Sequence, residues 1–218
     1  ATVSHAPVTE GRACLTCHNP HASNQDRLLR NEGAPLCLSC HDRTIDSKRG
    51  TIADIADRLA THANPHGPVA DNDCVTCHQP HGGEYTRLLT AAYPSKRYTA
   101  FAEDSYALCF ECHEVEAFEY AETADATGFR DGQRNLHFLH VSSETKGRTC
   151  RFCHDPHASG NAHQVTDSVA FGQWRIPLHF EATQTGGSCA PGCHQPRQYD
   201  RLAPKNLKRV TPGAVAKP

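Results

Sequence analysis

The sequence predicts a fold made mostly of loop, with short α-helices, little or no β-structure, and something other than apolar side chains filling its interior. Three observations predict it. Only 38% of the 218 residues are hydrophobic, and 15 glycines and 14 prolines interrupt any long regular element. Cysteine and histidine are far above ordinary usage, at 12 and 16 residues, while methionine is absent. A conventional apolar core is thin for this length, so we expect cysteine and histidine chemistry to hold the chain together.

Charge and hydropathy exclude two classes of partner. The formal net charge is −2 and no long basic run occurs, which argues against nucleic acid. No stretch reaches the roughly 18 apolar residues that cross a bilayer, so we expect no transmembrane segment. The chain opens at Ala1 without a signal peptide, and we take it as a mature form.

Every cysteine belongs to one kind of motif. Five segments read C-x-x-C-H, and the sixth, residues 189–194, has one extra residue between its cysteines. This motif is the attachment signature of c-type haem, because two thiols on one turn can add to the two porphyrin vinyl groups while the next histidine reaches the iron. We therefore predict six covalent haems c, numbered 1 to 6 along the chain. Their anchors are Cys14, Cys17, Cys37, Cys40, Cys74, Cys77, Cys109, Cys112, Cys150, Cys153, Cys189 and Cys193, and their proximal ligands are His18, His41, His78, His113, His154 and His194.

Two other interpretations use the same cysteines. Twelve cysteines could form six disulfides, or three Cys₄ zinc sites built from C-x-x-C halves. Neither needs a histidine directly after each pair. At the histidine frequency of this chain, six such neighbours arise by chance with a probability on the order of 10⁻⁷, which favours haem.

The absence of methionine determines the second axial ligand. Cytochromes c usually take His/Met or His/His ligation, so this chain predicts bis-histidine iron throughout. Ten histidines remain for six irons. The spacing favours His5, His21, His66, His81, His140 and His157 as distal ligands, with His62, His137 and His179 as lower-ranked substitutes, while His163 lies in a polar loop and is expected in solvent.

The motifs also define a repeat. Three segments extend to C-x-x-C-H-x-P-H, ending at His21, His81 and His157. Histidines three residues apart lie on the same side of a turn, so the second one should bind a neighbouring haem. We predict modules at residues 1–66 (haems 1 and 2), 67–140 (haems 3 and 4) and 141–200 (haems 5 and 6), with a tail at 201–218, all in one continuous haem-packed domain. Helices are expected over residues 51–63 and 102–121.

The run from Cys14 to His41 resembles the doubled C-x-x-C-H family of multihaem cytochromes c, and the resemblance extends over about residues 5–194. That family includes decahaem periplasmic conduits and hexahaem cytochromes that polymerise into extracellular nanowires. The resemblance implies an extended chain of stacked haems in place of an apolar core, and a location outside the cytoplasm, in the periplasm or in an extracellular filament.

The expected function is electron transfer along six closely spaced bis-histidine haems, without catalysis. We expect self-association into a filament, with redox proteins or extracellular acceptors as further partners. The alternatives are a monomeric periplasmic shuttle or conduit and an oxyanion reductase. The reductase is disfavoured because no C-x-x-C-K motif is present.

One pattern of ligation would explain a filament. If the histidine upstream of each module completes the preceding module's second haem, His66 serves the iron of His41 and His140 serves that of His113. His194 then has no downstream histidine, and His5 of a neighbouring subunit could complete its site in a head-to-tail contact. The alternatives are that His5 binds within its own first module, or that His179 fills the gap.

Overall fold

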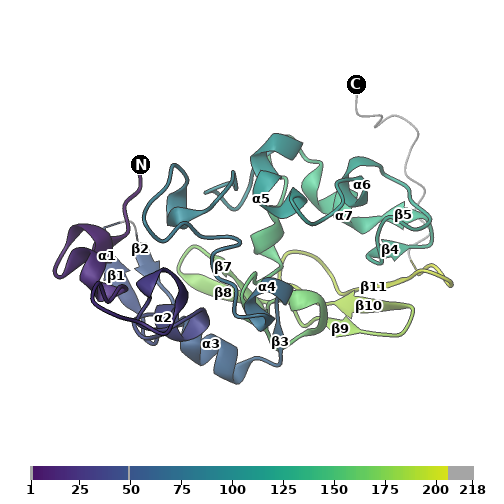
Figure 1. Ribbon diagram of the computed structural model, residues 1–218. Helices are drawn as coiled ribbons and strands as arrows, with labels where there is room; N and C mark the ends of the chain where they lie inside the picture. The colour runs from purple at the N-terminus through teal and green to yellow at the C-terminus, as the bar shows by residue number, and fades with distance from the viewer. Residues whose placement is uncertain (1, 49, 206–218) are drawn as a thin grey trace.

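The computed structural model describes residues 2–48 and 50–205. They form an elongated body in which the first 61 residues make one end, and strands β4, β5 and β9 to β11 lie toward the other (Figure 1). The α-helices are α1 (Ala6–Thr9), α2 (Ala34–Leu38), α3 (Ile55–Thr61), α4 (Gly67–Ala70), α5 (Ala107–Phe110), α6 (Glu116–Glu119) and α7 (Leu136–Val141). The 3₁₀ helices are η1 (Ala13–Thr16), η2 (Asp26–Leu28), η3 (Thr86–Leu88), η4 (Glu103–Tyr106), η5 (Cys150–Phe152) and η6 (Ala162–Gln164).

The expectation of a fold made mostly of loop, with little or no β-structure, is wrong. Within the described residues, eleven strands form five small antiparallel sheets. The strands are β1 (Ile45–Ser47), β2 (Gly50–Ile52), β3 (Asn64–Pro65), β4 (Arg130–Asp131), β5 (Arg134–Asn135), β6 (Ala158–Ser159), β7 (Ser168–Phe171), β8 (Trp174–Pro177), β9 (Glu181–Ala182), β10 (Gly186–Cys189) and β11 (Arg197–Asp200). None is longer than four residues, which is too short for an alternating pattern to be recognised in the sequence.

Most sheets are local hairpins. Strand β1 pairs with β2, β4 with β5, and β7 with β8, while β10 lies between β9 and β11. The exception is β3 with β6, where Asn64 pairs with Ser159 and Pro65 with Ala158. This pairing ties the region before the second module to the third module.

The two expected helices are shorter than predicted. In the first, Gly50–Ile52 belongs to β2, and α3 begins only after Asp54, whose side chain caps it by accepting from the N–H of Asp57 at 2.8 Å. The second is divided into η4, α5 and α6, because residues 111–115 turn at the Cys-His end of the fourth motif.

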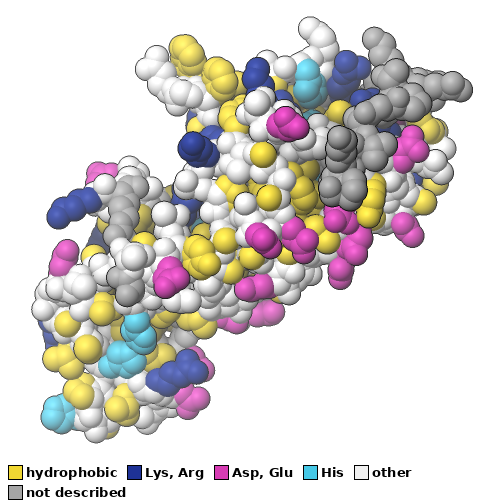
Figure 2. Space-filling model, turned by 90° about the horizontal axis from the view of Figure 1, so that it is seen from above, with side chains coloured by type: hydrophobic (Ala, Val, Ile, Leu, Met, Phe, Trp, Pro, Cys, Tyr) yellow, Lys and Arg dark blue, Asp and Glu magenta, His cyan; other side chains and the backbone are white. Residues whose placement is uncertain are grey.

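The apolar core is small, as the composition predicts. One cluster contains Phe152, Val165, Val169 and Leu178. A second consists of aromatic rings around Phe101, which lies 5.6 Å from Tyr106 and 6.0 Å from Phe118 between ring centres. Hydrophobic side chains are also scattered over the face shown in Figure 2. These clusters are too limited to span the elongated body, so other contacts must hold its parts together.

Residues 201–205 of the expected tail lie against β4 and the turn between β9 and β10. The N–H of Lys205 donates to Asp131 at 2.8 Å, and the guanidinium of Arg201 donates to the carbonyl of Gln184 at 2.8 Å. The remaining part of the predicted tail, 206–218, lies outside the described residues.

Candidate functional site

The five regular motifs fold into the same tight turn. In each, the N–H of the histidine donates to the carbonyl of the first cysteine, at 2.9 to 3.1 Å. This bond brings the two thiols and the imidazole to one side of the turn, as attachment of one porphyrin requires. In the sixth motif the extra residue changes the turn, and the N–H of His194 donates instead to the carbonyl of Pro191 at 3.4 Å.

A second contact orients the first histidine of every module. Nδ1 of His18, His78 and His154 lies 2.8, 2.9 and 2.8 Å from the carbonyl oxygen of the residue nine positions later. Those three residues all have positive φ, of 55°, 61° and 56°. With Nδ1–H donating to a carbonyl, Nε2 of each ring is left to bind a metal.

The segment after the first motif of the third module has the same backbone conformation as the corresponding segments of the first two modules. An Arg-Leu-Leu sequence at residues 27–29 and 87–89 has no counterpart in the third module, which predicts a diverged spacer. The structure nevertheless forms the same 3₁₀ turn at η2, η3 and η6, followed by an isolated bridge from the histidine to residue 29, 89 or 165. The shape depends on a left-handed backbone residue rather than on arginine, and His163 adopts it in the third module.

Four pairs of histidine rings face each other at nearly constant separation. Their centres lie 6.0 to 6.3 Å apart, and their planes differ by 3° to 25°. If a metal–imidazole bond is about 2.0 Å and the ring centre lies about 1.1 Å beyond, two rings on opposite sides of one metal have centres about 6.2 Å apart. Each pair therefore has the spacing of two axial ligands. The pairs are His5 with His41, His18 with His81, His66 with His113, and His78 with His157.

The remaining two proximal histidines lie near α7. The rings of His137 and His154 are 6.4 Å apart and tilted by 41°. Nδ1 of His137 is 2.9 Å from Thr127 Oγ1, and Nδ1 of His140 is 2.6 Å from the carbonyl of Leu136, so both resemble oriented ligands. Burial lowers the pKa of His140, and Arg148 and His194 lower it further, which places His194 near His140.

The second histidine of an H-x-P-H motif is expected to bind the haem of another motif. Two of the three such histidines face the proximal histidine of another motif. His81 and His157 each face the first proximal histidine of the preceding module. His21 is exposed and has no ring partner among the described residues, and residues 1–13 contain no further C-x-x-C-H motif. The structure thus separates His21 from the other favoured ligands.

The upstream histidines behave differently from the filament hypothesis. His5 faces His41, the second proximal histidine of its own module, and His66, the last residue of module one, faces His113, the second proximal histidine of module two. His66 therefore does not approach His41, and His5 lies against a histidine of its own chain, as the alternative within the first module requires.

His137, a lower-ranked candidate in the sequence, lies beside the proximal histidine His154. It lies three residues before His140 on α7, and the rule that such neighbours serve different irons applies to this pair as well. The other two lower-ranked histidines lie elsewhere: His62 has Nδ1 3.0 Å from the carbonyl of Arg58, and His179 is exposed.

The anchoring thiols of consecutive motifs lie close together. Burial, followed by Cys40, raises the pKa of Cys17. A hydrogen bond between the thiols of Cys37 and Cys74 raises the pKa of the first and lowers that of the second to about 7. This contact joins the second motif to the third, as the preceding one joins the first to the second.

The same succession continues to the last motif. Burial, followed by Cys109, raises the pKa of Cys77. A hydrogen bond to Cys150 raises the pKa of Cys109. Burial raises the pKa of Cys153 to about 11, with Cys189 contributing in the same direction. The six motifs are therefore neighbours in space in the order in which they occur in the sequence.

The residues present fit haem better than zinc or disulfides. All twelve cysteines are free thiols, and no group of three or more His, Cys, Asp or Glu among the described residues could hold a metal ion by itself. The facing rings instead need a planar group between them. Tyr106 is 1% exposed, and its hydroxyl has no hydrogen-bond partner within the described chain, although Cys109 and Cys150 are close enough to influence its pKa after burial. A buried hydroxyl without a hydrogen-bond partner, next to two cysteines that would attach haem, indicates that a further group belongs there.

Comparison with known proteins supports this chemistry. Residues 5–46 and 66–118 match a family model described as the doubled CXXCH motif. No curated protein matches the chain. Among the described residues, no helix has the length and apolarity required to cross a bilayer. The motifs indicate covalent binding of haem c, and they suggest the class of multihaem c-type cytochromes, whose members transfer electrons and are generally found outside the cytoplasm.

Proposed function

We propose that the protein carries electrons through six haems c arranged in sequence order, each iron held between two histidines of the chain. Haem supplies the one-electron chemistry when it is bound. The succession of neighbouring motifs, from Cys17 beside Cys40 to Cys153 beside Cys189, is the observation that carries the proposal.

Five of the proposed axial pairs follow from the ring geometry, and the sixth, His194 with His140, is proposed because the two histidines are near each other at α7. The first haems of modules one and two take their distal histidine from the next module. The second haem of module one takes His5 from its own module, and the second haems of modules two and three take His66 and His140, the last residues of the modules before them. His137 completes the first haem of module three. Haems 1 to 6 are thus held by His18 and His81, His41 and His5, His78 and His157, His113 and His66, His154 and His137, and His194 and His140.

The residues around the rings contribute orientation and shielding. Backbone carbonyls hold Nδ1 of His18, His78, His154 and His140, which fixes the direction of Nε2. Two histidine ligands give a lower potential than histidine with methionine, because imidazole donates more strongly to ferric iron.

His81 and His21 provide a matched test, because both end an H-x-P-H motif. In the holoprotein, His81→Ala should convert one low-spin haem to high spin, since His81 faces His18 at 6.1 Å. His21→Ala should leave the spin state of the monomer unchanged. Electron paramagnetic resonance and absorption spectra report the spin states, while intact mass gives the number of haems. Fewer than six haems, or equal spectra for the two variants, would contradict the proposal.

A filament is the second candidate, and His21 is the observation that favours it. In modules two and three, the equivalent histidine faces the first proximal histidine of the module upstream. No C-x-x-C-H motif lies upstream of His21 in residues 1–13, and binding a haem of another molecule would let His21 follow the same rule. The preceding subunit would offer His154, whose partner His137 is the most tilted of the paired rings. Such a head-to-tail contact builds an open filament when it does not close into a ring. Histidine side chains are exposed at the N-terminal end of the molecule (Figure 2).

This version of the filament differs from one in which His5 crosses between subunits. His21→Ala should shorten or abolish polymers in negative-stain images, whereas His5→Ala should change the spin state of haem 2 without preventing association. His163→Asn is the control, because it removes another exposed histidine and tolerates positive φ. A wild-type protein that stays monomeric at every concentration refutes the filament and leaves a monomeric electron carrier.

A further inference from the structure

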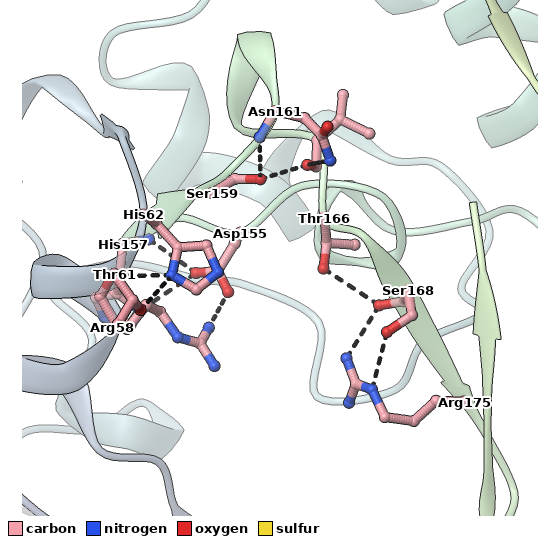
Figure 3. A network of polar contacts seen from close by, with 11 residues as sticks. Arg58, Thr61, His62, Asp155, His157, Ser159, Asn161, Thr166, Ser168 and Arg175 are labelled. Atoms are coloured by element: carbon pink, nitrogen blue, oxygen red, sulfur yellow. Dashed lines mark hydrogen bonds and ion pairs between the residues drawn. The ribbon is translucent and has the colours of Figure 1, made fainter. Parts of the chain in front are cut away.

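An arginine-rich cavity lies outside the proposed haem pairs. Its volume is about 240 Å³, and its lining comes from α3, from the fifth motif and the segment after it, and from the β7–β8 hairpin. Four arginines line it: Arg58, Arg97, Arg151 and Arg175. Arg58 and Arg175 extend into the same space from opposite sides (Figure 3).

The carboxylates of the cavity do not balance these charges. Two aspartates line it, Asp155 and Asp167. Asp155 is already bonded to Arg58 and also accepts from the N–H of His157 at 3.0 Å. Asp167 accepts from Nδ2 of Asn161 at 2.7 Å. The cavity therefore has two more guanidinium groups than carboxylates.

The surplus cations repel one another. Burial lowers the pKa of Arg58, and Arg175 lowers it further. Arg175 makes its hydrogen bonds to neutral acceptors, from Nε to Ser168 Oγ at 2.9 Å and from Nη2 to the Ser168 carbonyl at 3.1 Å. In the described part of the chain, no hydrogen bond or salt bridge engages the guanidinium of Arg97 or Arg151. An anion in the cavity would relieve this repulsion.

We propose that the cavity binds a doubly charged oxygen anion, supplied either by free phosphate or by the paired propionates of a neighbouring porphyrin. Guanidinium groups suit both sources, since their planar donors form two parallel hydrogen bonds with carboxylate or phosphate oxygens. A volume of about 240 Å³ has room for a small anion beside the arginines.

The position of the cavity couples the anion to the haem chain. His154 lines it, and His157 is joined to it through Asp155, so the anion lies beside histidines of haems 5 and 3. A negative charge there favours ferric over ferrous iron. By linkage, reduction of those haems weakens anion binding by the same factor. This part rests on the proposed haem pairs, whereas anion binding itself does not.

The test uses the holoprotein, titrated with inorganic phosphate by calorimetry in phosphate-free buffer of low ionic strength. The variants are Arg97→Gln, whose guanidinium has no described partner, and the double variant with Arg175→Gln. Lys48→Gln, in the exposed turn between β1 and β2, is the control for loss of one positive charge. Low-spin spectra confirm that each variant is folded.

Two results support the site and identify its occupant. Phosphate that binds wild type and the control, but binds the double variant at least tenfold more weakly, identifies free anion. No phosphate binding, together with a midpoint potential lowered in the double variant and unchanged in the control, identifies propionate; a tenfold effect corresponds to about 59 mV. The inference is overturned if the double variant matches Lys48→Gln in both measurements. Six intact low-spin haems in that case would leave the proposed electron transfer standing.

Discussion

Asn135 connects a local hydrogen-bond pair to two proposed haem ligands. It is 1% exposed and lies at the start of α7, the helix that carries His137 and His140. Its Oδ1 accepts from the N–H of Phe138 at 3.1 Å, and its Nδ2 donates to the carbonyl of Ala117 at 3.1 Å. The side chain therefore caps α7 and holds it against α6.

Replacing Asn135 with alanine removes both bonds. Loss of the helix cap costs about 1 kcal/mol. Leaving the partner carbonyl without its donor in a buried site costs about 1–3 kcal/mol more. The free energy of unfolding should fall by about 3 kcal/mol in total, which for a chain of this size lowers Tm by about 6–12 °C. Haems 5 and 6 should lose their low-spin signal before the other four.

Asp54→Ala provides the matched control. Asp54 caps α3 with one bond, from the N–H of Asp57 at 2.8 Å, and α3 carries none of the paired histidines. The expected cost is about 1 kcal/mol, or about 2–4 °C in Tm. Thermal unfolding is followed by far-UV circular dichroism and by the low-spin haem absorbance. If Asn135→Ala costs no more than Asp54→Ala, or if all six haems change spin state together, the link from this cap to the ligands is refuted.

Three further changes test other parts of the structure. His66→Ala should produce one high-spin haem by electron paramagnetic resonance, because His66 faces His113 at 6.0 Å; a spectrum identical to wild type would contradict that pair. Gly147→Ala should lower stability by about 1–3 kcal/mol in urea unfolding, because its Cβ would lie 2.4 Å from the carbonyl oxygen of Val141; an unchanged midpoint would contradict the close packing. The chain prepared without haem should lack cooperative unfolding, because its apolar clusters are small, and a sharp thermal transition would show that they suffice.

The sequence predicts the chemistry of the motifs better than the fold around them. C-x-x-C-H spacing determines a local turn, so the thiols and the adjacent histidine can be placed without tertiary information. The strands could not be predicted, because pairs as short as Asn64 with Ser159 depend on contacts 95 residues apart. The left-handed turn at His163 also escapes prediction, since histidine carries no strong preference for positive φ comparable to that of glycine.

The distal histidines, too, can be predicted only in part from the sequence. Spacing excludes His81 and His157 from the iron of their own motif, and the structure places each beside the proximal histidine of another motif. Spacing does not show which one, because that choice depends on how modules pack. The ten available histidines also exceed the six irons, so His21 and His137 could be ordered only after the structure placed one in solvent and the other beside His154.

The ring pairs explain how an elongated chain with small apolar clusters can behave as one body. His81 and His157 extend from modules two and three to His18 and His78 in the modules before them. Each boundary between modules is therefore crossed by a proposed axial bond, and β3 with β6 adds a backbone pairing from the end of module one to module three. His41 with His5 closes the second site within module one, whereas His113 with His66 crosses the boundary between modules one and two. Proposed bonds across the module boundaries make the three repeats interdependent, which is why removing one ligand at a boundary should disturb two modules rather than one.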